Sequence, residues 1–392
     1  MNKFSYILNL IVATLSTLVP KNKKTWVFGS WFGKQFSDNS KYLYNYVSQY
    51  DEDINVIWIG KNKKVIHDLR NQGVNAYYYK SLLGIYYQAR ASVVFFTHSV
   101  GADLNPLFIG YTTFRVQLWH GMALKKIGFD NDKVIKSTSF SIKHPKLYEI
   151  ISNTRNDMII STGKECTKVF SSAFREPSDK IFETGFPRND VFTKPRKVNR
   201  KYRAIYMPTF RDVEAHGGDL FEKYQFDAQE IDKLLVANSI DLYIRVHPAN
   251  SPSDLLKKVI SECQSIQLFT VPDIYEAINS FDCLITDYSS IMFDFSLSGR
   301  SMIFAPFDLK DYLASNRDLY FDYESIIPAN DCYFNWPTLI GRLIEEKKNQ
   351  TLKNKEFSSL LSFHDVIETK KDKYSLNVYE AVKRAISLKN NK

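Results

Sequence analysis

The sequence has 392 residues, of which 44% are apolar and 24% are charged, and its formal net charge is +9. A chain of this length exceeds one ordinary hydrophobic core, which favours two domains, and it is too apolar for a disordered protein. The positive charge fits a phosphorylated substrate or an anionic membrane surface. Nucleic acid is not expected, because the sequence has no zinc-finger spacing, RNP motif or basic heptad region.

The amino-terminal segment, residues 1–24, is largely apolar from Phe4 to Val19 and ends in lysines. It is short and polar for a membrane-spanning helix, and it lacks the small-residue cleavage site of a secretory signal. One face of a helical wheel carries the apolar side chains Phe4, Ile7, Leu8, Ile11, Leu15 and Leu18. We therefore expect an amphipathic helix on an anionic membrane surface, and packing on the protein's own core is the alternative.

Residues 25–193 are expected to form a first α/β domain, in which short apolar runs alternate with helical stretches. Asp38-Asn-Ser40 fits the start of a helix through Val47, and a second helix is expected from Gly163 to Phe174. The predicted strands are Thr25–Trp31, Asn55–Gly60, Asn75–Tyr79, Ser92–His98, Phe114–His120 and Met158–Thr162.

A polar, basic stretch at residues 194–201 marks the boundary to a second domain, residues 194–392, in which the alternation restarts. The last helix of the chain could pack back on the first domain. Helices are expected at 228–238, 252–262, 273–280 and 289–298. The predicted strands are Arg203–Phe210, Asp241–His247, Ile266–Thr270, Cys283–Asp287 and Ser301–Phe307.

The four cysteines show no pairing at metal-ligand spacing, and they fit reduced core residues of a cytosolic protein. They are Cys166, Cys263, Cys283 and Cys332.

The first candidate site residue is His120, which ends the predicted strand Phe114–His120 and is followed by Gly121. Ligands of an open parallel sheet bind at the carboxyl ends of its strands. A histidine at this place could act as a general base. For an isolated histidine, a structural role with a hydrogen bond to a backbone carbonyl is the commoner alternative.

Two further strand ends carry basic side chains. Arg211 could bind a phosphate through two hydrogen bonds, or it could pair with Asp212 on the surface. Arg245 and His247 are two residues apart and project to the same face, so that His247 could donate to a phosphate oxygen. Packing of both side chains against a helix is the alternative.

The last strand end is the segment from Thr286 to Ser290. Ser289 and Ser290 precede a predicted helix, whose free N–H groups favour a phosphate. Simple N-capping is the alternative, and Asp287 could cap the helix, orient a histidine or hold a ribose. Together the four strand ends offer one base from the first domain and several phosphate ligands from the second. This is a layout for catalysis across an interdomain cleft.

The chain resembles the CDP-glycerol glycerophosphotransferase family of teichoic acid synthesis, the TagB and TagF type enzymes, over roughly residues 25–345. The resemblance implies a GT-B-like fold, with two Rossmann-like domains facing a central cleft. It rests on the segments Asp38-Asn-Ser-Lys-Tyr42, Trp119-His-Gly121, Leu124-Lys-Lys-Ile-Gly128, Gly185-Phe-Pro-Arg-Asn-Asp190, Pro208-Thr-Phe-Arg-Asp212, Arg245-Val-His-Pro248, Thr286-Asp-Tyr-Ser-Ser290, Phe293-Asp294, and Phe307-Asp-Leu-Lys-Asp-Tyr312 with Arg317.

The resemblance also implies the reaction, in which an acceptor hydroxyl attacks the β-phosphate of CDP-glycerol and CMP is released. It implies that His120 is the catalytic base and that His247 is a second catalytic histidine beside the donor pyrophosphate. The implied ligands of the donor phosphates and nucleotide are Arg211, Arg245, Thr286, Asp287, Ser289, Ser290 and Arg317. The implied acceptor-side residues are Gly121, Lys125 and Lys126. No metal and no cofactor are implied.

The partners that the resemblance implies are CDP-glycerol, an undecaprenyl-diphosphate-linked saccharide acceptor and an anionic membrane. The enzyme would then be a peripheral protein at the cytoplasmic face of the cell membrane. The sequence indicates no oligomeric state.

Three departures from the family bear on the acceptor. Met122 stands where the family usually has Thr, Pro328-Ala329 replaces a Pro-Gly pair, and the long amino-terminal region of polymerising members is missing from this sequence. We expect a primase that adds one glycerol phosphate. The alternatives are a polymerase, a ribitol-phosphate or capsule enzyme of the same family, a nucleotide-sugar glycosyltransferase, and a non-enzymatic module at the membrane surface.

Overall fold

The computed structural model describes residues 12, 14–131, 155–196, 199–209, 211, 220–246, 252–315, 318–327, 329–349, 357–365 and 373–390. The chain forms two compact units. Unit 1 consists of Met1–His120, Gly128–Asp190 and Asp365–Lys392, and unit 2 consists of Gly121–Ile127 and Val191–His364.

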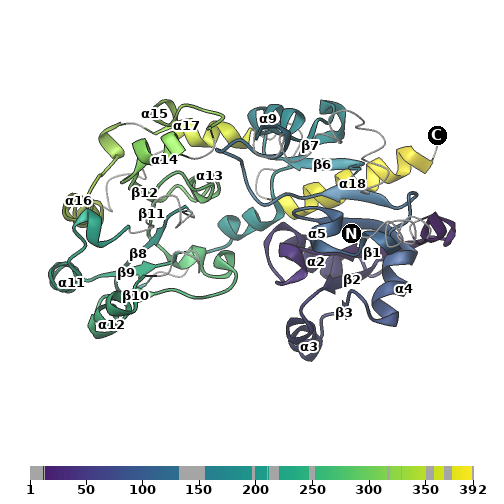
Figure 1. Ribbon diagram of the computed structural model, residues 1–392, viewed down its shortest axis with the longest axis horizontal. Helices are drawn as coiled ribbons and strands as arrows, with labels where there is room; N and C mark the ends of the chain where they lie inside the picture. Colours follow the sequence, from purple (N-terminus) through teal and green to yellow (C-terminus); the bar gives the residue numbers. More distant parts are fainter. Residues whose placement is uncertain are drawn as a thin grey trace. The chain divides into compact units, whose positions relative to one another are not determined.

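Unit 1 is built on a parallel sheet with the strand order β3-β2-β1-β4-β5-β6-β7 (Figure 1). The strands are β1 (Asn22–Phe28), β2 (Asn55–Gly60), β3 (Ala76–Tyr78), β4 (Ala91–Phe96), β5 (Phe114–Gln117), β6 (Met158–Ser161) and β7 (Ile181–Glu183). Successive side chains of β1 and β4 enter cores on opposite faces, because Val27 clusters with Val94 while Phe28 stacks on Phe95 at 4.4 Å. Strands that are apolar on both faces are typical of a parallel sheet covered by helices on both sides.

The helices of unit 1 pack on this sheet. They are α2 (Asp38–Tyr50), α3 (Lys63–Asn71), α4 (Leu82–Arg90), α5 (Val100–Asp103), α9 (Lys164–Phe174) and α18 (Tyr374–Asn390). Side-chain oxygens of Asn62 and Ser81 cap α3 and α4. The carboxyl-terminal helix α18, yellow in Figure 1, contacts α2, and its Tyr379 ring lies 5.9 Å from the Trp26 ring of β1. The end of the chain therefore completes one side of the core of unit 1.

Unit 2 is built on a second parallel sheet, with the order β10-β9-β8-β11-β12. Its strands are β8 (Tyr202–Met207), β9 (Ile240–Ile244), β10 (Ile266–Leu268), β11 (Cys283–Thr286) and β12 (Ser301–Phe304), and its helices are α11 (Ala228–Ala237), α12 (Asp254–Glu262), α13 (Ile291–Ser296), α14 (Leu309–Ser315), α15 (Tyr323–Ile326), α16 (Trp336–Lys348) and α17 (Ser358–Leu361). Trp336 is buried in the core, 4.9 Å from the Tyr206 ring, and its indole N–H donates to the Leu220 carbonyl.

Each sheet has a point at which the direction of strand addition reverses. It lies between β1 and β4 in unit 1 and between β8 and β11 in unit 2. Ligands of open α/β sheets bind beyond the carboxyl ends of the strands at such a switch point. The residues that follow these four strands are therefore the candidates for a functional site.

The α/β fold with parallel sheets, predicted from the sequence, is confirmed. Arrangement of the halves around a central cleft stays a prediction. The strand predicted to end at His120 ends at Gln117, which leaves His120 in the following loop. The predicted helix at 273–280 is instead a pair of 3-10 turns, Ile274–Glu276 and Ile278–Ser280, which meet at Ala277.

We expected residues 25–193 to form one domain. The segment Gly121–Ile127, however, is part of unit 2. Backbone pairing explains this: Lys126 N–H donates to the Asp318 carbonyl and Tyr320 N–H donates to the Leu124 carbonyl, both at 2.8 Å. The chain therefore leaves unit 1 directly after His120 and returns at Gly128.

Residues 1–11 and 13 of the amphipathic helix expected at residues 1–24 lie outside the described residues, and Asn22–Lys24 belong to β1 instead of a helix. Residues 14–18 are helical, and within them Leu15 and Leu18 are 57% and 75% exposed while Ser16 is buried. Within the described parts of the chain, no helix combines the length and apolar character needed to cross a membrane.

Candidate active site

His120 follows β5, next to the switch point of unit 1, and two neighbouring rings hold its imidazole. The ring stacks on His98, which follows β4, at 4.4 Å, and on its neighbour Trp119 at 4.1 Å. Its Nδ1 lies 2.9 Å from the Thr97 carbonyl oxygen. A carbonyl oxygen can only accept, so Nδ1 carries the proton and Nε2 keeps a lone pair.

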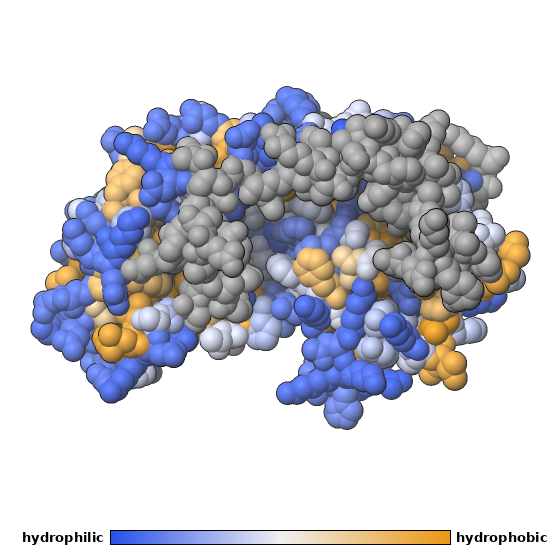
Figure 2. Space-filling view, in the orientation of Figure 1, coloured by the Kyte–Doolittle hydropathy of each residue, from blue (hydrophilic) through white to orange (hydrophobic). Residues whose placement is uncertain are grey.

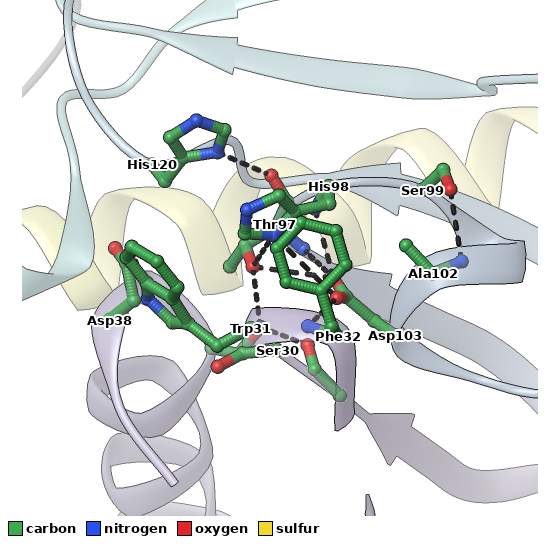
Figure 3. A network of polar contacts seen from close by, with 12 residues as sticks. Ser30, Trp31, Phe32, Asp38, Thr97, His98, Ser99, Ala102, Asp103 and His120 are labelled. Atoms are coloured by element: carbon green, nitrogen blue, oxygen red, sulfur yellow. Dashed lines mark hydrogen bonds and ion pairs between the residues drawn. The ribbon is translucent and has the colours of Figure 1, made fainter. Parts of the chain in front are cut away.

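The charge state of His120 follows from this environment. Burial, then the neighbouring His98, and also Arg188 lower the pKa of His120 to about 3, although the hydrogen bond with Thr97 opposes the shift. No described residue hydrogen-bonds Nε2, and Figure 3 shows this nitrogen pointing away from the surrounding polar network. The imidazole is therefore neutral near pH 7, and its free nitrogen can accept a proton.

His98 is tied to a buried carboxylate, Asp103. Asp103 is fully buried and accepts the backbone N–H groups of Phe32, Thr97 and His98 at 2.7–2.9 Å. One of its oxygens lies 3.6 Å from His98 Nδ1. Burial lowers the pKa of His98, and the carboxylates of Asp103 and Asp38 oppose this shift. Asp103 thus fixes the loops after β1 and β4 to each other (Figure 3).

A second buried pair, Asp38 with Arg188, fixes the backbone of His120. Arg188 Nη1 donates to Asp38 Oδ1 and to the His120 carbonyl, both at 2.9 Å. The Asn39 amide reaches the carbonyls of Leu118 and Trp119 at 3.0 Å. The helix expected to start at Asp38-Asn-Ser40 does begin at Asp38. Ser37 is the N-cap residue, and Asp38 binds Arg188 and the Trp31 indole instead.

Several site residues have backbone angles that side chains other than glycine rarely adopt. The φ values of Trp31, Phe32, Asp38 and Trp119 lie between 46° and 62°. Bulky residues in this region are strained by roughly 1–3 kcal/mol each and persist where the surroundings hold them. Gly121, predicted to give backbone room beside His120, has a φ of 135°.

In unit 2, Arg211 lies at the switch point inside a closed ion network. The side chain is 1% exposed, and it donates to Asp287 Oδ2 and to both oxygens of Asp308 at 2.7 Å. The rings of Tyr288 and Tyr312 flank the guanidinium at 4.7 and 5.1 Å. Burial favours a lower pKa of Arg211, but the Asp287 carboxylate outweighs it and raises this pKa. For Asp308, burial favours a higher pKa, but the hydrogen bonds from Arg211 keep this pKa below its usual range.

This network changes what we expected of three predicted donor ligands. Arg211 has two carboxylate partners within the protein, so a phosphate contact would require it to exchange them. Asp287 uses both oxygens to accept the Thr209 N–H, at 2.9 and 3.0 Å. The Thr286 hydroxyl donates to the Met207 carbonyl at 2.6 Å and joins β11 to β8. All three side chains thus hold the two switch-point loops together.

Ser289 and Ser290 differ from these residues because their hydroxyls make no hydrogen bond within the described part of the chain. Ser290 is the N-cap residue of α13, but its side chain does not cap the helix. Both residues are partly exposed. The helix expected at 289–298 is shorter, Ile291–Ser296, so the hydroxyls rather than a long helix are the available donors.

Of the three other predicted ligands of the donor, one lies in a loop of unit 2 and two lie outside the described residues. Arg245 follows β9, and its guanidinium donates to the carbonyls of Val271 and Pro272. His247 and Arg317 lie outside the described residues.

Lys125 and Lys126, which we assigned to the acceptor side, belong to unit 2 together with the predicted donor ligands. The Lys125 ammonium lies 5.0 Å from the Tyr312 ring, which also flanks Arg211. Lys126 forms an exposed ion pair with Asp318 at 3.1 Å, which contributes little to stability.

Sequence reasoning missed several residues of these networks. His98 ends an apolar run in the same way as His120, so the strand-end argument could have found it. Asp103 stands outside every segment singled out in the sequence, although two of its partners, Thr97 and His98, are only six and five residues away. Arg188 lies in the Gly185–Asp190 segment that carried the resemblance, but sequence reasoning assigned it no role because Asp38 lies 150 residues away. Within the described residues, no group of three or more His, Cys, Asp and Glu side chains is arranged to hold a metal ion.

Comparison with known proteins gives consistent matches. Residues 11–383 match a family model described as CDP-glycerol:poly(glycerophosphate) glycerophosphotransferase. A teichoic acid glycerol-phosphate transferase of Staphylococcus aureus is 31% identical over 79% of this chain and 80% of its own length. A teichoic acid glycerol-phosphate primase of Bacillus subtilis is 25% identical over 85% of this chain and 86% of its own.

A longer relative and a solved structure complete the comparison. A teichoic acid poly(glycerol phosphate) polymerase of Staphylococcus epidermidis is 30% identical over 78% of this chain, which spans only 43% of the polymerase. A structure of the wall teichoic acid polymerase TagF superposes with a TM-score of 0.75 at 24% identity, covering 99% of this chain and 97% of that chain. This structural likeness concerns the fold.

Proposed function

The chain belongs to the CDP-glycerol:poly(glycerophosphate) glycerophosphotransferase family and is therefore a transferase. On this premise we propose that it moves glycerol phosphate from CDP-glycerol to a lipid-linked saccharide. The reaction releases CMP and is a step of teichoic acid synthesis.

The neutral, oriented imidazole of His120 carries this proposal. Its Nδ1 proton is engaged by the Thr97 carbonyl, and its Nε2 lone pair is available. In the reaction, the acceptor hydroxyl loses its proton to Nε2 as its oxygen bonds to the β-phosphorus of the donor. The bond from this phosphorus to the bridging oxygen breaks, and that oxygen leaves as part of CMP. The imidazole is unprotonated at neutral pH and can take up the proton, although a general base is most effective when its pKa lies near the operating pH.

We assign the donor phosphates to unit 2. The hydroxyls of Ser289 and Ser290 support this role, because they follow β11 at the switch point of a parallel sheet and bind no other group among the described residues. Arg245 donates to two backbone carbonyls, and it is a cation that can exchange them for phosphate oxygens. Arg211 then positions the loops that carry these groups through Asp287 and Asp308.

We also propose that the protein binds the cytoplasmic face of the cell membrane. Leu15 and Leu18 are exposed, and Leu82, Leu83 and Tyr86 of α4 are 87%, 49% and 53% exposed. Lys21 links these two elements, since its ammonium donates to the carbonyls of Ser16 and Ala89. Figure 2 shows the apolar atoms over α4 at the right of the view. An apolar surface of this kind on a basic protein fits an anionic bilayer.

The mass of the product shows both which group the donor supplies and how many units are added. Purified protein is incubated with CDP-glycerol or CDP-ribitol and a lipid-linked disaccharide. We expect the mass of glycerol phosphate to be added; a single addition identifies a primase and a ladder identifies a polymerase. Addition of ribitol phosphate alone, or of a sugar from a nucleotide sugar, would contradict the proposed donor.

A further inference from the structure

We propose that Trp31 and Phe32 form a binding shelf on which a sugar ring of the acceptor lies beside His120. The inference rests on the proposed function, since it names the place of the acceptor at the same site. It assigns a role to two residues that neither the sequence patterns nor the transfer reaction had required.

The first observation is the exposure of the two rings. Trp31 is 37% exposed and Phe32 is 48% exposed. In contrast, Trp26, Trp58 and Trp336 are at most 1% exposed. Adjacent aromatic side chains that remain at the surface beside a polar site are typical of a binding surface.

The second observation is that the protein holds these rings in a strained backbone. Trp31, Phe32 and Gly33 are three successive residues with φ of 46°, 57° and 70°. Bulky side chains rarely adopt this region, and such strain concentrates at sites that clamp ligands. Separate hydrogen bonds impose it: Phe32 N–H donates to Asp103 at 2.8 Å, Trp31 N–H to the Thr97 hydroxyl at 3.3 Å, and the Trp31 indole N–H to Asp38 at 3.0 Å.

The third observation is position. The pair follows β1 at the switch point of the unit 1 sheet, where ligands bind in this kind of fold. The Phe32 and Trp31 rings lie 4.2 and 5.3 Å from the His98 ring, and Trp31 lies 6.2 Å from His120 (Figure 3). A ligand that covers these rings therefore lies next to the imidazole that receives the proton.

The chemistry of the surface favours a sugar over an alkyl chain. One face of a pyranose carries C–H groups that pack on an aromatic ring, and its hydroxyls need polar partners at the rim. Lys34 and Gln35, directly after the shelf, are exposed, and the His98 side chain is 16% exposed. An alkyl chain would bury these polar groups without hydrogen bonds.

The test compares kinetic constants in Trp31→Leu and Phe32→Gly. Glycine suits the positive φ of Phe32, so that variant removes a ring without straining the fold. Phe334→Ala, which removes an aromatic side chain 57% exposed in unit 2, is the control. CMP release is measured with CDP-glycerol and the shortest-chain lipid-linked disaccharide that supports wild-type turnover.

We expect the acceptor KM to rise about tenfold in each variant while the donor KM and the control stay unchanged. An unchanged acceptor KM would overturn the inference. So would a rise in the donor KM, which would indicate stacking of the cytosine, or a defect seen only with long-chain acceptors in vesicles, which would indicate membrane contact.

If the wild-type protein shows no acceptor-dependent CMP release, the proposed function is contradicted. The shelf is then tested by a binding experiment that does not depend on turnover. Tryptophan fluorescence is followed while the disaccharide is titrated into wild type and Trp31→Phe. Quenching that is lost in the variant supports the shelf, whereas equal quenching or none overturns it.

Discussion

The imidazole rings of His98 and His120 stack with their centroids 4.4 Å apart and their planes 16° apart. Two cations at this separation repel each other, and burial disfavours each of them further. Burial lowers the pKa of both histidines, and the neighbouring His98 lowers the pKa of His120 further. Burial and His98 thus keep His120 neutral, while Asp103 fixes the position of His98.

Replacement of His120 by Asn is expected to abolish most turnover while donor binding is retained. A positioned general base contributes about 10²–10⁴-fold to a rate. The Asn amide can still donate to the Thr97 carbonyl, so the loop should keep its conformation. The measurements are kcat from CMP release and the donor Kd by calorimetry. His67→Asn, which changes an exposed histidine of unit 1, is the control. Near wild-type kcat in His120→Asn would remove this residue from the role of base.

The stability of the protein should fall as the pH is lowered from about 6.5 towards 3. The pKa of His120 is about 3 in the folded protein, whereas the ordinary pKa of a histidine is 6.5. Between these values the unfolded chain binds a proton that the folded protein does not, so stability is lost as the pH falls. Urea unfolding at several pH values measures the slope. His120→Asn should reduce it by up to about 1.4 kcal/mol per pH unit; an unchanged slope would contradict the neutral buried state.

Arg211→Ala and Ser290→Ala should separate structural from ligand-binding effects in unit 2. Loss of Arg211 leaves Asp287 and Asp308 without their partner, so we expect the free energy of unfolding to fall by about 3–5 kcal/mol. Loss of the Ser290 hydroxyl should leave stability unchanged and raise the donor KM by about ten- to a hundredfold. Denaturation midpoints and donor KM are measured for both. A stable Arg211→Ala protein with only a raised donor KM would show that Arg211 binds the phosphates directly.

Charge placed on the apolar surface of α4 should weaken membrane binding. Leu82→Glu adds a carboxylate to the most exposed of its leucines, which would repel anionic headgroups. Co-sedimentation with phosphatidylglycerol vesicles should fall for this variant. Leu255→Glu, at a 69% exposed position of α12 in unit 2, should bind like wild type. Equal losses in both variants would point to net charge rather than to this surface.

The sequence predicted the sheets well because strands that are apolar on both faces have a clear signature. Asn55–Gly60 matches β2 at both ends. The errors come from tertiary contacts. The segment Gly121–Ile127 joins unit 2 because Lys125 pairs with Leu319 through the backbone. The local sequence contains no pattern that predicts a partner so far along the chain.

Candidate site residues could be predicted where a polar residue follows an apolar run, and less so where the partners of a residue are distant. His120 was proposed in this way, and among the described residues it combines a hydrogen bond to a backbone carbonyl with an Nε2 that has no partner. Arg211 was also found, but its burial between Asp287 and Asp308 depends on the packing of three loops. The sequence contains no pattern that predicts the left-handed backbone of Trp31 and Phe32. Hydrogen bonds to residues distant in the sequence hold this conformation.

Acceptor-dependent CMP release from CDP-glycerol tests the central claim most directly. Purified protein is incubated with CDP-glycerol, with and without a lipid-linked disaccharide, and CMP and product mass are followed. We predict that CMP forms only with the acceptor and matches the glycerol phosphate gained by the product. Absence of CMP in both cases, with CDP-ribitol also tried, would contradict the account.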